Sequence, residues 1–147
     1  MKKSKLLICG TLVLAVVGII LIGGYVLQRE SLINANLDTP FQLKINQTAF
    51  IESENLKIKF WNVTEDSRCP SDVVCVWVGQ ATVVVNILKN EQNLGDFSLT
   101  SRLGNEDLAI KTFDGYSIKL VKVDPYPKST SKIKLSDYVI TLLVCKI

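Results

Sequence analysis

Two of the four cysteines in this chain are spaced closely enough to react with each other. Cys69 and Cys75 lie six positions apart in a short polar stretch, and in an oxidising compartment such a pair closes a small disulfide loop. For so short a ring, the bond stabilises the fold by roughly 2 kcal/mol. Three alternatives remain open for Cys145. It replaces Cys69 or Cys75 in the disulfide, stays as a buried thiol, or forms a disulfide with another chain.

The rest of the composition argues against most catalytic chemistry. Histidine is absent, which excludes Ser-His and Cys-His nucleophile pairs and any imidazole metal site. Structural zinc sites need four ligands, and thioredoxin-like sites need a Cys-x-x-Cys spacing that is not present. Adjacent acids such as Glu65-Asp66 and Glu106-Asp107 point to opposite faces of a strand, so neither pair resembles the carboxylates of a hydrolase. We therefore predict no enzyme activity, no cofactor and no metal.

Three residues near the cysteines are candidates for a binding surface. Asp66 and Arg68 flank the loop and are suited to an anionic or polar ligand. The structural alternative, which we favour, is an Asx-turn at Asp66 and an arginine that donates hydrogen bonds to loop carbonyls. Trp61 points away from Phe60 if the strand alternates, which makes it a candidate for an exposed aromatic contact. Packing of Trp61 against a neighbouring loop remains the alternative.

The amino-terminal residues predict a membrane anchor. Residues 6–27 form an uncharged run of twenty-two residues, and about 20 apolar residues suffice to cross a bilayer core. Lys2, Lys3 and Lys5 precede this run and should stay in the cytoplasm, which places the remainder of the chain outside. A cleaved signal peptide is the alternative, although its apolar region is usually shorter, about 7–15 residues. Lipid attachment at Cys9 is disfavoured because the residue before it is not small.

The charge distribution argues against a nucleic-acid partner. The formal net charge of +3 comes from the three amino-terminal lysines, and the chain beyond them carries fourteen basic and fourteen acidic residues. Nucleic-acid binding requires a concentrated positive face. We read residues 28–39 as a polar linker and residues 40–147 as one exported domain.

That domain has the alternating apolar pattern of half-buried strands. Alternation predicts strands over residues 41–45, 56–60, 75–88 and 137–146, and in the third of these it places Trp77 on the core face with Ala81 and Val83. Asp114-Gly115 predicts a tight hairpin. About seven short strands without a helical period favour an antiparallel β-sandwich, for which an immunoglobulin-like arrangement is one option, with a small open barrel as the second choice.

The stretch DSRCPSDVVCVWVGQATVVV resembles a family of small bacterial exported proteins and lipoproteins that share a DSRCP-x4-C-x-W-x-G motif. The motif positions here include Pro70, Trp77 and Gly79 in addition to the two cysteines, Asp66 and Arg68. The resemblance implies a β-domain in the cell envelope and implies no reaction. Unlike the lipoprotein members, this chain lacks a credible lipid-attachment sequence.

These observations lead to one functional hypothesis and two alternatives. We expect a single-pass, extracytoplasmic (periplasmic or extracellular) domain that binds an envelope protein or polymer without catalysing a reaction. The first alternative is a redox or enzyme accessory that uses the Cys69/Cys75 loop, and the second is a structural scaffold subunit of the cell envelope.

Overall fold

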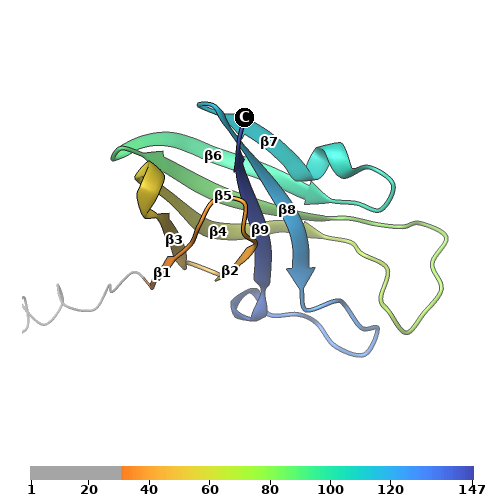
Figure 1. Cartoon of the computed structure of the whole chain (residues 1–147). Coiled ribbons are helices and arrows are strands. Elements are labelled where there is room, and N and C mark those ends of the chain that lie inside the picture. The colour runs from red at the N-terminus through yellow and green to blue at the C-terminus, as the bar shows by residue number, and fades with distance from the viewer. Residues whose placement is uncertain (1–30) are drawn as a thin grey trace, which may run out of the picture. The chain divides into compact units, whose positions relative to one another are not determined.

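In the computed structural model, which describes residues 31–147, the chain forms two β-sheets that face each other (Figure 1). In spatial order, the first sheet contains β1 (Leu32–Asn34), β3 (Thr48–Ile51), β4 (Leu56–Asp66), β5 (Ala81–Lys89) and β6 (Gln92–Ser101). The second contains β2 (Phe41–Lys44), β9 (Val139–Lys146), β8 (Tyr116–Asp124) and β7 (Ile110–Phe113). All pairings are antiparallel except that of β1 with β3. The predicted mainly β, antiparallel sandwich is confirmed.

The core lies between the two sheets and follows the period-two pattern of the strands. In β5, the alternate residues Ala81, Val83, Val85 and Ile87 are completely buried. In β9, Ile140, Leu142 and Val144 are likewise buried and face this layer from the other sheet. The residues between them on both strands are only partly exposed. Alternation therefore assigned the inward face of these strands correctly.

Tight turns connect the strands, and one of them is the predicted hairpin at Asp114-Gly115. Asp114 and Gly115 join β7 to β8 with φ values of 40° and 80°. Asn90 and Glu91 join β5 to β6 in the same way, with φ values of 50° and 63°. Two successive residues with positive φ match the twist of a hairpin, which is why an Asp-Gly pair suits this position. Three 3₁₀ turns complete the domain: η1 (Glu52–Glu54), η2 (Glu106–Ala109) and η3 (Leu135–Asp137).

The strand predicted over residues 75–88 begins later than expected, at Ala81. Residues 67–80 instead form a long hairpin loop, which projects from the end of the sandwich (Figure 1). The placement of Trp77 in the core was therefore wrong, since its exposed fraction is 82%. The reason is that β4 ends at Asp66 and the chain enters the disulfide ring at Cys69, so Trp77 has no strand opposite it to pair with. A valine-rich run does not stay in a sheet without that partner.

The amino-terminal part of the domain also differs from the prediction. Leu32–Asn34, which lies inside the predicted linker, forms β1 and pairs with β3. A three-residue strand is too short to produce a recognisable alternation, and the four-residue β3 was not predicted for the same reason. The anchor predicted for residues 6–27 lies outside the described residues. Within residues 31–147, no helix has the length and apolar character needed to cross a membrane.

Candidate functional site

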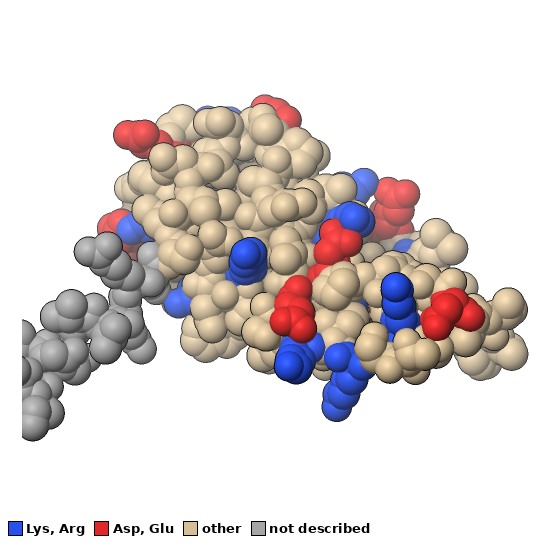
Figure 2. Space-filling model, turned by 90° about the horizontal axis from the view of Figure 1, so that it is seen from below, with Lys and Arg blue, Asp and Glu red and all other residues tan. Residues whose placement is uncertain are grey.

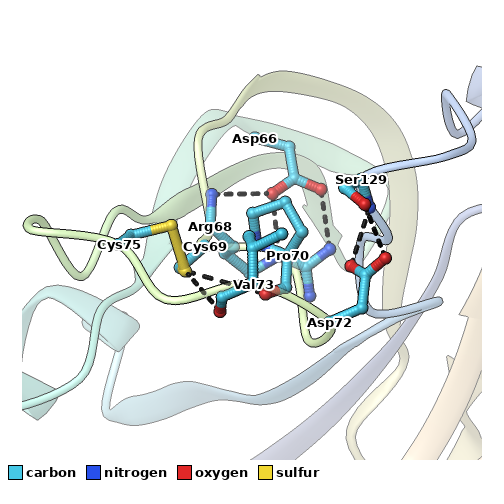
Figure 3. Close-up of a disulfide and its surroundings, with 8 residues drawn as sticks. All are labelled: Asp66, Arg68, Cys69, Pro70, Asp72, Val73, Cys75 and Ser129. Atoms are coloured by element: carbon cyan, nitrogen blue, oxygen red, sulfur yellow. Dashed lines mark hydrogen bonds and ion pairs between the residues drawn. A yellow bond between two sulfur atoms is a disulfide. The ribbon is translucent and has the colours of Figure 1, made fainter.

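The disulfide loop, residues 67–80, is closed by a bond between Cys69 and Cys75, as predicted (Figure 3). The Cα atoms of the two cysteines are 5.9 Å apart. At the base of the loop, the Ser67 amide donates to the Gln80 carbonyl over 2.8 Å, and the Cys69 amide donates to the Val78 carbonyl over 3.4 Å. The covalent bond and these backbone bonds together hold the two arms of the loop in one arrangement.

A buried ion pair fastens the beginning of the loop to the sandwich. The Arg68 guanidinium donates to both carboxylate oxygens of Asp66, over 2.8 and 2.6 Å. Its remaining donors reach the carbonyls of Val123 at 2.6 Å and Pro125 at 3.0 Å, in the opposite sheet and the loop that follows it. The side chains of Arg68 and Asp66 are only 8% and 9% exposed. Arg68 therefore links the two sheets, and few of its donors are left for a ligand.

Tyr138 completes this polar cluster from the far end of the chain. Its hydroxyl donates to Asp66 over 2.9 Å. Burial raises the pKa of the Asp66 carboxyl, but the bonds from Arg68 and Tyr138 outweigh that effect and leave the pKa below its ordinary value. Burial and the neighbouring Asp66 carboxylate raise the pKa of Tyr138 to about 12. The carboxylate thus stays ionised and the phenol stays neutral at physiological pH, which suits a structural cluster better than an acid–base pair.

A second contact holds the tip of the disulfide ring. Asp72 accepts hydrogen bonds from the Ser129 amide at 2.8 Å and the Ser129 hydroxyl at 2.6 Å (Figure 3). These two bonds lower the pKa of the Asp72 carboxyl. Nearby, the Ser71 amide donates to the Pro127 carbonyl over 3.0 Å. The ring is therefore tied to the loop that follows β8 as well as to its own strand.

The braced loop carries an unusual amount of exposed apolar surface. The exposed fractions are 101% for Val74, 94% for Val76 and 82% for Trp77, and Val73 and Val78 are about half exposed. On the face shown in Figure 2, acidic and basic side chains are interspersed with uncharged surface and do not form a patch of one sign. Exposed apolar residues held on a fixed backbone are typical of a contact surface for another molecule.

The other predicted site residues lie in different environments. Trp61 is 53% exposed, as expected, but it lies five residues before Asp66 on β4, roughly 16 Å away at the rise of a strand. Lys59 stacks on its ring at 5.3 Å from the centroid. The structure therefore does not bring Trp61 together with Asp66 and Arg68 into one surface.

Gly79 and Pro70 have structural positions within the disulfide loop. Gly79 has a φ of 67°, and a Cβ atom built on it would lie 1.9 Å from the Ser67 carbonyl oxygen. Only glycine fits so close to the opposite arm of the loop. Pro70 lies inside the disulfide ring, and its carbonyl accepts a backbone bond from the Val73 amide over 3.3 Å.

Several residues of the site were not predicted from the sequence. Tyr138 and Ser129 contact Asp66 and Asp72 over sequence separations of 72 and 57 residues. No local pattern marks such pairs, because the contact depends on how two loops from different sheets meet. Among residues 31–147, Cys145 is the one cysteine outside the disulfide and is partly buried, so it does not replace Cys69 or Cys75 as a partner, and the other two alternatives left open for it stand.

The described residues offer no metal-binding cluster, since no three His, Cys, Asp or Glu side chains within residues 31–147 come together to hold an ion. Comparison with known proteins does not add a function: no family model, no curated protein and no solved structure matches this chain.

Proposed function

We propose that this protein is a membrane-anchored, extracytoplasmic binding module that contacts an envelope partner through its disulfide loop without catalysing a reaction. The observation that carries the proposal is the exposure of Val74, Val76 and Trp77 on a loop with a covalent staple and two polar braces. Exposing these side chains to water is unfavourable for an isolated domain, by about 25 cal/mol for each Å² of apolar surface. Burial of this surface against a partner recovers that free energy.

The rigidity of the loop supports binding. An ordered loop loses little conformational entropy when its partner arrives, so more of the contact energy contributes to affinity. Tryptophan is also among the residues that dominate the energy of protein interfaces. The loop lies at the end of β5 opposite the β5–β6 turn, and β1 lies away from the loop (Figure 1).

The proposed location rests on the uncharged run over residues 6–27, the lysines before it and the disulfide. Disulfides persist mainly in oxidising compartments, which agrees with a domain outside the cytoplasm.

The anchor and the compartment can be tested together by the intact mass of the protein from unreduced membranes after alkylation of free thiols. We expect the full-length mass with two alkyl labels, at Cys9 and Cys145, because Cys69 and Cys75 are bonded to each other. The same sample reduced before alkylation serves as the control and should carry four labels. The mass of a shortened chain that begins near Tyr25 would contradict a retained anchor. Four alkyl labels on the unreduced sample would contradict export.

The contact surface can be tested by photo-crosslinking in intact cells. A photoreactive amino acid at Val74 should give discrete crosslinked species, whereas the same group at Glu91, in the turn at the other end of β5, should not. Trp77→Ser should reduce the Val74 species by roughly tenfold, the effect of losing a moderate interface residue. Because Trp77 is exposed, this variant should keep the thermal stability of the parent. If the photoreactive group gave the same crosslinked species at Val74 and at Glu91, that result would argue against the proposal.

A further inference from the structure

A groove of about 440 Å³ lies beside the disulfide loop. It lies between the carboxyl-terminal arm of the loop, the segment that follows β6, and strand β8. Its walls combine apolar side chains, basic side chains and one acidic side chain, and those that matter here are Val78, Leu103, Tyr126, Arg102, Lys119 and Glu106. Leu103 is 82% exposed, so the apolar surface of the loop continues into this groove.

One side of the groove is formed by a strand edge that is only partly paired. β7 pairs with β8 from Tyr116 to Lys119, but β8 continues to Asp124. Among residues 31–147, no further strand follows β7 along this edge. The edge beyond Lys119 therefore lies next to the groove, and Arg68 already bonds to one of its carbonyls, that of Val123. A partly open strand edge is a template for an added strand from another chain.

The charges at the groove favour an acidic occupant. Lys119 is paired with Glu106 at 3.0 Å, and Arg68 is paired with Asp66. The exposed side chain of Arg102, in contrast, makes no hydrogen bond or ion pair with any residue in the described part of the chain. Among the basic side chains that line the groove, Arg102 is thus the one that forms no ion pair with a carboxylate of the described residues. An arginine in this state is suited to a carboxylate, which it can bind with two parallel hydrogen bonds.

We infer that this groove binds an extended peptide segment of a partner protein, in which apolar and acidic side chains alternate. The segment adds to the edge of β8 beyond Lys119, so its backbone bonds to the strand and its alternate side chains point to opposite sides. Its apolar side chains pack against Val78, Leu103 and Tyr126, and a carboxylate pairs with Arg102. This inference rests on the proposed function, because the groove continues the surface of the disulfide loop and specifies the class of partner.

The test uses the full-length protein in detergent and three fluorescein-labelled, end-blocked peptides, measured by fluorescence anisotropy. The first peptide alternates valine with glutamate, the second alternates valine with lysine, and the third is the glutamate peptide with alternate backbone amides methylated. We expect saturable binding of the first peptide alone. Methylation removes the N–H donors that pair with a strand edge, so it separates strand addition from simple attraction between charges.

Variants of the protein complete the test. Arg102→Glu should weaken binding of the glutamate peptide at least tenfold, because a charge-assisted bond is lost and a like charge is introduced. Lys111→Glu is the matched control, since Lys111 is also an exposed cation but lies on β7 outside the groove, and it should leave the affinity unchanged. Circular dichroism should show that both variants are folded.

Either of two results would overturn the inference: no saturable binding of the glutamate peptide, or equal binding of all three peptides. An Arg102→Glu variant with unchanged affinity would also overturn it. If any of these results were found while the photoreactive group at Val74 still gave discrete crosslinked species in cells, the groove inference alone would fail. The binding function of the loop would then stand. If the group at Val74 gave no discrete crosslinked species either, both the groove inference and the proposed binding function would fail.

Discussion

Gly79→Ala is expected to lower the free energy of unfolding by at least about 3 kcal/mol, the sum of a left-handed backbone and a steric overlap. Gly79 has a φ of 67°, a conformation that is costly for residues with a side chain. The new Cβ would also lie 1.9 Å from the Ser67 carbonyl oxygen. That oxygen belongs to the backbone, so no change of rotamer relieves the overlap. The two arms of the disulfide loop would have to separate.

The measurement is urea-induced unfolding followed by circular dichroism, and Gly104→Ala is the matched control. Gly104 also has a positive φ, 80°, but no atom lies within 4 Å of the position that a Cβ on it would occupy. Its substitution should therefore cost only the backbone contribution, about 1 kcal/mol. A Gly79→Ala variant no less stable than Gly104→Ala would show that the close approach of the two arms is not maintained in solution.

Asp66→Ala is expected to destabilise the protein by about 3 kcal/mol, because it leaves the charge of a nearly buried arginine without its partner. Arg68 would keep its bonds to the Val123 and Pro125 carbonyls, but those dipoles do not neutralise a guanidinium. The surface pair of Lys119 and Glu106 provides the control, since Glu106 is 80% exposed. Glu106→Ala should change stability by less than about 1 kcal/mol. Equal effects of the two substitutions would contradict the structural role of the Asp66 brace.

The same ion pair should make stability depend on pH in a defined direction. The pKa of Asp66 is below its ordinary value of 3.8 in the folded protein, so the unfolded chain takes up the proton first as the pH falls. Its contribution is therefore complete above the ordinary pKa and is lost as the pH falls through the folded-state pKa. Between about pH 6 and about pH 3, the parent protein should lose more stability than the Asp66→Ala variant. If the parent protein and the Asp66→Ala variant lost the same amount of stability over this pH range, the acid sensitivity would come from other carboxylates.

The Gly79 and Asp66 substitutions concern the same part of the molecule for different reasons. Gly79 allows the two arms of the loop to approach each other, and the Asp66–Arg68 pair joins the loop to the opposite sheet. The exposed valines and Trp77 lie between these supports and contribute little to the core. Stability and binding are thus separable in this loop: changes at its base should affect folding, and changes at its tip should affect binding.

The sequence by itself determined the inward faces of the longer strands, the hairpin at Asp114-Gly115 and the disulfide between Cys69 and Cys75. Each of these depends on residues close together in the chain: alternation follows from the geometry of a single strand, and a hairpin follows from the φ values that its turn residues tolerate. The same local reasoning placed Trp77 in the core, because its alternation continues that of β5.

Only the tertiary structure decided where along the chain the alternating pattern no longer corresponds to a paired strand. A strand exists as long as another strand pairs with it, and the pairing of β4 with β5 ends at Asp66 and Ala81, so Trp77 is exposed. The contacts that brace the loop, from Arg68 to the Val123 carbonyl and from Tyr138 to Asp66, span 55 and 72 residues. Such contacts depend on how two sheets pack and on which loops meet at their ends, and no periodicity within one segment encodes that arrangement.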